Sequence, residues 1–317
     1  MAVYASVLDL VGHTPLVDVS TLSTNPTSRI LVKLEGQNPG GSVKDRVALS
    51  MVDAAEKEGL LVPHSGQVIV ESSSGNTGIG LAMISKVRGY TLKIVLPENV
   101  SEERRQLLAI WGAEIISSPG SEGSNGAMRR AQDLAAAHAD WWFPFQYGNQ
   151  ANVTAHLEGT GPEIWRDCPE VTHLVAGLGT SGTLVGVGTF LKQRNPGVKV
   201  WAVEPPAGEM VDGLKNFDEG FVPPIFDANG GADLLDRKMI VRPRESLEWV
   251  RRMIDVGVFA GISSGAVMAG AVRCAAEVDN AVVVAIAPDG GWKYLSTGAW
   301  TDDLDEVTER ASRIMYF

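Results

Sequence analysis

The chain has 317 residues, of which 44% are hydrophobic and 21% are charged, and its formal net charge is −11. At about 100–200 residues per domain this length suggests two domains, and the composition excludes general disorder. The negative charge argues against a nucleic-acid partner, because neutralising phosphates requires clustered lysine and arginine. No apolar run approaches the ~18–20 residues that span a membrane. The two cysteines, Cys168 and Cys274, form no CxxC pair, so we expect free thiols and a cytoplasmic protein.

Short apolar runs alternate with amphipathic segments along the chain. The predicted strands cover residues 30–34, 67–71, 93–96, 114–117, 172–176, 199–204 and 281–287. The predicted helices cover residues 44–58, 78–87, 102–111, 123–138, 153–167, 183–193, 246–256 and 265–277. This alternation, with strands rich in β-branched residues, predicts an α/β fold with mainly parallel sheets. The polar segment 143–151 is a candidate crossing between two domains.

The first loop with chemical character is Asn38–Arg46, which follows a strand and opens a helix. We expect Ser42 to cap this helix and Asp45 to complement its positive end. Lys44 is then a cation at the wrong end of a helix, where desolvation and the helix dipole disfavour its ammonium form. Schiff-base chemistry needs a neutral lysine amine. From this loop alone an ordinary surface lysine is an equal alternative, because the misplaced charge costs only about 0.3–1 kcal/mol.

The second loop, Ser72–Gly78, lies between a predicted strand and a predicted helix. Its side chains include the hydroxyls of Ser73, Ser74 and Thr77 and the amide of Asn76. Backbone N–H groups at a helix start bind anions, so this loop suits a carboxylate or a phosphate. A simple helix cap would explain one hydroxyl but not several.

The third loop, Gly177–Thr183, follows a predicted strand and precedes a helix. Gly177, Gly179 and Gly182 match the pattern G-x-G-x-x-G, and Glu204 ends the next strand, so a dinucleotide site is a rival interpretation. The loop also carries three hydroxyl side chains, at Thr180, Ser181 and Thr183. A pyrophosphate site does not need these donors, whereas a compact terminal phosphate uses them.

The fourth loop, Gly261–Gly265, is a small-residue turn that opens a helix and, taken alone, is explained by capping and close packing. Together, three helix starts suited to anions and one lysine fit a ligand with a phosphate, an aldehyde and a second anion. Pyridoxal phosphate bound to an amino acid has these three groups.

At these residues the sequence resembles the cysteine synthases (O-acetylserine and O-phosphoserine sulfhydrylases) of the fold-type II pyridoxal-phosphate enzymes, particularly the M-type. The resemblance covers nearly the whole chain, and its motifs include Gly12–Pro15, the Lys44 loop, Ser74–Gly78, Gln146–Asn149, Gly179–Thr183 and Gly291–Thr297. It implies two three-layer α/β domains, as in the tryptophan synthase β chain, with twisted, mostly parallel sheets and the active site between them. Residues 46–150 would form a smaller, mobile substrate domain, and residues 1–45 with 151–317 a larger domain that binds the cofactor phosphate.

The resemblance also implies a role for each matched residue. Lys44 holds the aldehyde of pyridoxal 5′-phosphate and transfers the substrate proton. Asn76 binds the cofactor 3′-oxygen, and Ser263 faces the pyridine nitrogen. The phosphate is held by Gly179, Thr180, Ser181, Gly182 and Thr183. The substrate carboxylate is held by Ser73, Ser74, Thr77 and Gln146. The family often has threonine at the positions of Ser73 and Gly40, and we expect Gly40 to make its loop looser.

The implied reaction replaces the β-substituent of O-acetylserine or O-phosphoserine with a sulfur nucleophile and gives L-cysteine. Sulfide, thiosulfate and a small thiocarboxylated carrier protein are all admissible donors, and the family resemblance points to a homodimer. Lys215 either meets the phosphate of O-phosphoserine or is a solvated lysine that balances Asp218 and Glu219. We expect the apolar C-terminus, Ile314–Phe317, to dock on the larger domain, with a lid over the active site as the alternative.

Three alternatives stay open from the sequence. They are a serine or threonine dehydratase of the same fold, a dinucleotide-dependent oxidoreductase, and a non-catalytic regulatory protein that keeps the cofactor pocket. The intact Lys44 argues against the last, and the loop around Asn76 has no explanation in the second. The five histidines, His156 among them, show no metal-ligand spacing. We therefore expect no metal site and assign the histidines no catalytic role.

Overall fold

The structure is a computed structural model that describes residues 3–313 apart from 74, 101 and 220, with only the backbone at 124, 312 and 313. The chain forms two compact units. The first contains the described parts of residues 1–11 and 38–152, and the second contains residues 12–37 and the described residues from 153 onward. The predicted larger domain includes residues 1–45, whereas the described residues 3–11 and 38–45, with Lys44, pack with the first unit. The chain leaves the first unit after Asn152, next to the polar segment 143–151.

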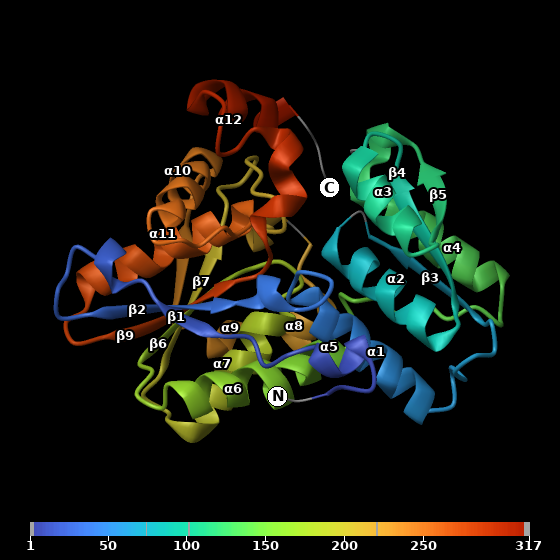
Figure 1. Cartoon of the computed structure of the whole chain (residues 1–317), viewed down its shortest axis with the longest axis horizontal. Coiled ribbons are helices and arrows are strands. Elements are labelled where there is room, and N and C mark those ends of the chain that lie inside the picture. The colour runs from blue at the N-terminus through green and yellow to red at the C-terminus, as the bar shows by residue number, and fades with distance from the viewer. Residues whose placement is uncertain (1–2, 74, 101, 220, 314–317) are drawn as a thin grey trace. The chain divides into compact units, whose positions relative to one another are not determined.

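The first unit is built on three parallel strands in the order β3-β4-β5. These strands are β3 (Val68–Ser72), β4 (Thr91–Pro97) and β5 (Glu114–Ser118). Its helices are η1 (Val7–Leu10), α1 (Lys44–Lys57), α2 (Asn76–Arg88), α3 (Glu102–Ile110), η4 (Gly120–Glu122) and α4 (Gly123–Ala137). Ile69 and Ile94 pack against α1 and α2, whereas Val70 and Val95 pack against α4 (Figure 1). This two-residue alternation makes a three-layer unit.

The second unit is built on six strands in the order β1-β2-β9-β6-β7-β8, and only β1 is antiparallel to its neighbour. The strands are β1 (Leu16–Asp18), β2 (Arg29–Leu34), β6 (His173–Gly177), β7 (Lys199–Glu204), β8 (Arg237–Ile240) and β9 (Val282–Ala287). Its longer helices are α6 (Gly161–Asp167), α7 (Gly182–Arg194), α10 (Pro243–Ile254), α11 (Ile262–Glu277) and α12 (Leu304–Arg313). Its shorter helices are η2 (Ser20–Leu22), η3 (Glu35–Gln37), η5 (His156–Thr160), η6 (Phe217–Glu219), α8 (Pro224–Ala228), α9 (Gly231–Leu234) and η7 (Gly291–Thr297). Helix α5 (Gln150–Ala155) contains the passage from one unit to the other.

Strand β9 shows how the second unit is layered. Val283 and Ala285 pack with α10 and α11, whereas Val284 and Ile286 pack with α7 (Figure 1). All six residues of β9 are buried, and fully burying a valine or isoleucine contributes about 1.5–3 kcal/mol. In such sheets ligands bind beyond the carboxyl ends of the strands, which here are the loops that follow β6 and β9.

The predicted α/β fold with mainly parallel sheets is confirmed. Each of the seven predicted strands is present, with ends that differ by at most two residues. The sequence missed the two outermost strands of the second sheet, β1 and β8, because these are short and β8 is mostly exposed. The predicted helix 153–167 was wrong as a single element: α5 and α6 are joined there by the π-helical turn η5. Within the described ranges no helix combines the length and the apolar character needed to cross a bilayer.

Candidate active site

Lys44 is the first residue of α1, at the end of a tightly folded loop. The Ser42 hydroxyl accepts the backbone N–H of Lys44 at 3.2 Å, although Val43, not Ser42, is the capping residue. The Asp45 carboxylate accepts the N–H of Gly40 at 2.5 Å. A β-carbon at Gly40 would lie 2.6 Å from Asp45 Oδ1. The expectation that Gly40 loosens the loop was therefore wrong, because the missing side chain lets Asp45 close it.

The loop between β3 and α2 brings three of the predicted carboxylate ligands together. The Ser73 hydroxyl accepts the N–H groups of Gly75 at 3.4 Å and Gly78 at 3.1 Å. The buried Thr77 hydroxyl donates to Gln146 Oε1 at 2.7 Å. Asn76 is the first residue of α2, and Ser74 lies outside the described residues. The positive end of this helix and its neighbouring polar side chains suit a small carboxylate.

Glu71 is a buried carboxyl group next to this loop, and it was not among the predicted site residues. It is 1% exposed, and it accepts the N–H of Ser72 at 2.8 Å and of Gln146 at 3.4 Å. Burial raises its pKa to about 7, although these N–H groups act in the opposite direction. Burial, and then the charge of Glu71, raise the pKa of Tyr147 to about 12. Glu71 thus ties the end of β3 to the segment that carries Gln146.

The loop between β6 and α7 forms a cradle with backbone and hydroxyl donors. A β-carbon at Gly179 would lie 2.7 Å from the Gly213 carbonyl oxygen, so only glycine permits this close approach. Thr180 and Ser181 are buried, and Ser181 starts α7 with a left-handed φ of 71°. Among the described residues, the Ser181 hydroxyl has no hydrogen-bond partner.

A phosphate group would satisfy the unpaired hydroxyl and the helix start of this cradle. A buried hydroxyl without a partner costs about 1–3 kcal/mol, and a phosphate oxygen would remove that cost. Helix N-termini favour the same ligand because their backbone N–H groups are unsatisfied and their dipole is positive. The residues present therefore fit the phosphate of pyridoxal phosphate.

Ser263 lies close to the cradle within the second unit. It is 4% exposed and is the second residue of α11. A β-carbon at Gly213 would lie 3.7 Å from Ser263 Oγ, and Gly213 also contacts Gly179 as described above. The N–H of Gly261 donates to the Asp289 carbonyl at 2.9 Å. Ser263 thus lies near the cradle, beside the loops that follow the neighbouring strands β6 and β9. That Gly179 and Ser263 bind one cofactor stays a prediction.

Lys215 lies beside the same loop. Its backbone N–H donates to the Leu178 carbonyl at 2.7 Å, and its Nζ lies 4.9 Å from the centre of the Phe221 ring. Burial lowers the pKa of its amine. The two acidic residues nearby in the sequence also make contacts elsewhere, since Asp218 pairs with Lys238 at 3.2 Å and Glu219 accepts the N–H of Gly208. The Lys215 side chain is thus half-buried against an aromatic ring, and its contact with a substrate phosphate stays a prediction.

Glu204 decides against the dinucleotide interpretation. The residue is 0% exposed. Its carboxylate accepts the N–H of Phe217 at 3.1 Å and lies 2.8 Å from Lys238 Nζ. A dinucleotide site needs this carboxylate for a ribose hydroxyl. Because the group is buried and already paired, Glu204 does not serve that purpose.

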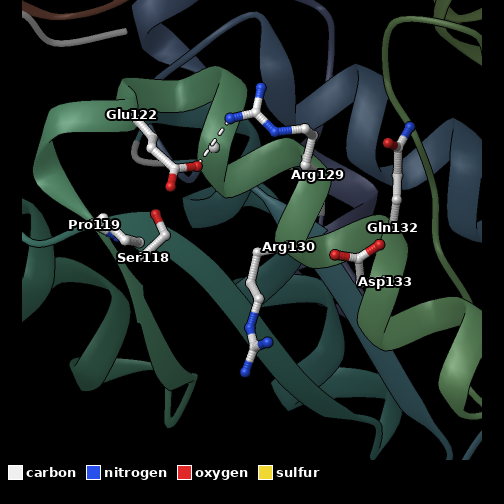
Figure 2. A pocket seen from close by; sticks show the side chains of 8 residues that line it. Ser118, Pro119, Glu122, Arg129, Arg130, Gln132 and Asp133 are labelled. Atoms are coloured by element: carbon white, nitrogen blue, oxygen red, sulfur yellow. Dashed lines mark hydrogen bonds and ion pairs between the residues drawn. The ribbon is translucent and has the colours of Figure 1, made fainter.

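A separate surface hollow of about 280 Å³ lies along α4 in the first unit. Figure 2 shows its polar lining, in which Glu122 and Arg129 form an ion pair at 2.8 Å. The lining residues are Ser118, Pro119, Glu122, Gly126, Arg129, Arg130, Gln132 and Asp133. None of the predicted cofactor or substrate residues belongs to this set.

Comparisons with known proteins agree with this geometry. Cysteine synthase B of Pseudomonas aeruginosa is 39% identical over 299 residues, which cover 94% of this chain and 98% of that protein. The crystal structure of O-ureido-L-serine synthase has a TM-score of 0.88 and 38% identity, covering 94% of this chain and 96% of that one. O-acetylserine sulfhydrylase isoform 3 from Entamoeba histolytica has a TM-score of 0.87 and 33% identity, covering 98% of this chain and 96% of that one. The family description "Pyridoxal-phosphate dependent enzyme" matches residues 7–289. The resemblance predicted from the sequence is confirmed, and the chain belongs to the pyridoxal-phosphate dependent enzymes.

Proposed function

We propose that this protein is a cysteine synthase that replaces the β-substituent of an activated serine with a sulfur nucleophile. The cysteine synthase B relative supports this reaction. The observation that supports it is a pair of loops whose geometry suits two different anions. One is the buried cradle at Gly179–Thr183, and the other is the smaller site at Ser73, Thr77 and Gln146. An amino-acid substrate and a phosphorylated cofactor need both.

When bound, pyridoxal phosphate supplies an aldehyde for the substrate amine and a ring that stabilises negative charge at the substrate Cα. Gly179, Thr180, Ser181, Gly182 and Thr183 hold its phosphate. Asn76 holds its 3′-oxygen, and Ser263, a neutral hydroxyl, faces its pyridine nitrogen.

Lys44 holds the cofactor aldehyde and moves the substrate proton. With substrate bound, the free Nζ of Lys44 would remove the proton from the substrate Cα and later return a proton to the same atom. Ser73, Ser74, Thr77 and Gln146 hold the substrate carboxylate, which fixes the Cα next to that amine.

The half-buried Lys215 supports O-phosphoserine as a substrate in addition to O-acetylserine. A phosphate leaving group gains a charge-assisted hydrogen bond there, whereas an acetyl group does not. Lys215→Ala should lower kcat/KM for O-phosphoserine by about tenfold and spare O-acetylserine. An equal loss for both esters would remove this assignment.

The sulfur donor is sulfide, thiosulfate or a small thiocarboxylated carrier protein, and the enzyme acts as a homodimer in the cytoplasm. The family resemblance supports the homodimer, and the free thiols of Cys168 and Cys274 support a reducing, cytoplasmic setting. Light scattering of the purified protein tests the dimer, and rates with sulfide and with a thiocarboxylated peptide compare the donors.

One experiment tests the central assignment. Borohydride reduction of the holoenzyme, followed by peptide mass spectrometry, should place a pyridoxyl group on Lys44. The same preparation should form cysteine from O-acetylserine and sulfide. A protein that forms pyruvate at the same rate with and without sulfide would instead be a dehydratase.

A further inference from the structure

Phe145 adopts a backbone conformation that is unusual for a bulky residue. Its φ is 48°, in the left-handed region, and such a conformation costs on the order of 1–3 kcal/mol and persists only where surrounding contacts enforce it. Phe145 directly precedes Gln146, one of the residues proposed to bind the substrate carboxylate. The conformation of Phe145 therefore sets the direction in which the Gln146 side chain leaves the backbone.

Backbone hydrogen bonds to strand β3 hold the chain at Trp142, shortly before this turn. The N–H of Trp142 donates to the Val68 carbonyl, and the N–H of Val70 donates to the Trp142 carbonyl, both at 2.9 Å. Pro144 has no N–H, so this pattern of bonds cannot continue through it. The turn that follows must be held by something other than the backbone of β3.

The Glu71 side chain holds that turn. Glu71 is the fourth residue of β3, and its carboxyl group accepts the N–H of Ser72 at 2.8 Å and that of Gln146 at 3.4 Å. Burial raises the pKa of this group to about 7, and the N–H of Phe145 is among the backbone groups that act against the rise. The N–H groups of Phe145 and Gln146 lie on either side of the left-handed residue. One carboxyl group thus bridges the strained backbone.

Other contacts complete the turn around Gln146. The Phe145 carbonyl accepts the N–H of Gly148 at 2.9 Å. The Asn152 amide donates to the Gln146 carbonyl at 2.9 Å. The Gln146 side chain accepts the Thr77 hydroxyl through Oε1 at 2.7 Å. Because Oε1 faces Thr77, the amide N–H groups of Gln146 are the part that can donate to a substrate carboxylate, which only accepts.

We propose that Glu71 is a positioning residue that keeps Phe145 left-handed and thereby directs the Gln146 amide toward the substrate carboxylate. Glu71 acts through Gln146, so the inference rests on the proposed function of this loop. Without the carboxyl group, Phe145 can relax to an ordinary negative φ, which turns the Gln146 side chain away from Thr77. The substrate then loses a preorganised hydrogen bond, while the phosphate cradle keeps its own contacts.

Substitutions of Glu71 separate this role from general stability. Glu71→Ala removes both acceptor oxygens, and Glu58→Ala removes an exposed glutamate at the end of α1 as the matched control. Gln146→Ala removes the amide itself and serves as the reference. The readouts are kcat and KM for O-acetylserine with the holoenzyme, and the dissociation constant of pyridoxal phosphate titrated into each apoprotein.

We expect Glu71→Ala and Gln146→Ala each to raise KM about tenfold, with kcat and cofactor affinity changed less than about threefold. A contact that the bound substrate and the transition state share affects KM alone, whereas a general loosening of the unit would also lower kcat. The double variant Glu71→Ala/Gln146→Ala should have a KM no higher than that of Gln146→Ala, because no amide is left to direct.

Two substitutions of Phe145 test the strained backbone directly. Phe145→Ala and Phe145→Gly both remove the ring, but only glycine adopts a positive φ without steric cost. In the Glu71→Ala background we expect KM with Phe145→Gly to be at least about threefold lower than with Phe145→Ala. With Glu71 in place, the two Phe145 variants should differ less. Equal KM values in the Glu71→Ala background would overturn the proposal.

The outcomes separate the two levels of the argument. A wild-type enzyme that forms no cysteine from O-acetylserine, or an unchanged KM in Gln146→Ala, would overturn the proposed function of this loop. A raised KM in Gln146→Ala with a wild-type KM in Glu71→Ala, or additive losses in the double variant, would overturn the role of Glu71 alone. If Glu71→Ala does not fold, Glu71→Leu keeps most of the bulk without an acceptor. A raised KM in that variant supports the role of Glu71, and an unchanged KM overturns it.

Discussion

The two units each place a polar loop between a parallel strand and a helix, but they build the loops differently. In the loop between β3 and α2, side chains contact one another and the backbone: Thr77 donates to Gln146, and Ser73 accepts two N–H groups. In the loop between β6 and α7, the backbone itself is brought close, with Gly179 against Gly213, and the Ser181 hydroxyl is left without a partner among the described residues.

This difference matches the two ligands that the loops are proposed to bind. A substrate that comes and goes is held by side chains that have partners of their own when it leaves. A resident phosphate can satisfy a hydroxyl that would otherwise be buried at a cost of about 1–3 kcal/mol. Among the described residues, the Ser73 and Thr77 hydroxyls of the first loop thus have partners without a ligand, whereas the Ser181 hydroxyl of the second does not.

The largest expected effect on activity comes from substituting Lys44, which belongs to neither loop. Lys44→Ala should lower kcat by ~10²–10⁴-fold, because the variant lacks the group that moves the substrate proton. Borohydride should leave no pyridoxyl group at position 44. Lys57→Ala, at the exposed other end of α1, is the matched control. Retention of activity in Lys44→Ala would remove the assignment of this lysine.

The next prediction compares cofactor binding after substitution of one glycine from each loop. Gly179→Ala places a β-carbon 2.7 Å from the Gly213 carbonyl oxygen, whereas Gly75→Ala meets no atom within 4 Å. We expect Gly179→Ala to weaken cofactor binding about tenfold, because the cradle must open, and Gly75→Ala to bind the cofactor normally. Equal effects in cofactor titrations would mean that the two loops do not differ as described.

A smaller effect concerns substrate affinity alone. Gln146→Ala removes the acceptor of the Thr77 hydroxyl and should raise KM for O-acetylserine about tenfold. Cofactor affinity should stay at its wild-type value. Gln132→Ala, in the exposed lining of the hollow on α4, is the control. Weakened cofactor binding in Gln146→Ala would contradict the assignment of substrate binding to the first loop and cofactor binding to the second.

The last effect concerns folding and not catalysis, and it is a dependence of stability on pH. Glu71 has a pKa of about 7 when folded and a reference value of 4.5. The folded protein therefore binds more protons between these values, and stability falls as pH rises through them, by at most about 1.4 kcal/mol per pH unit. Glu71→Gln should remove this dependence in urea unfolding of the apoprotein, and the exposed Glu58→Gln should keep it. The same slope in Glu71→Gln would contradict the assignment.

The sequence predicted what depends on local pattern. Strand runs such as Val282–Ala287 and the hydroxyl and glycine loops are local features, and the structure places those loops at helix starts. It did not predict contacts between distant segments. Glu71 is a lone carboxylate in an apolar strand, and its hydrogen bond to Gln146 spans 75 residues. The close approach of Asp45 to Gly40 depended on a loop conformation that the residue types alone do not specify.

The π turn at His156 has a consequence for how this enzyme tolerates insertions and deletions. A π turn holds one residue more than an α turn, so a deletion of one residue within 157–159 would restore an unbroken α-helix. Thr160 Oγ1 lies 2.9 Å from Nδ1 of the buried His156. An unbroken helix would carry residue 160 to a new angular position, and this contact would be lost. A deletion that makes this helix regular would therefore destabilise the second unit, although a regular helix ordinarily forms more easily than an interrupted one.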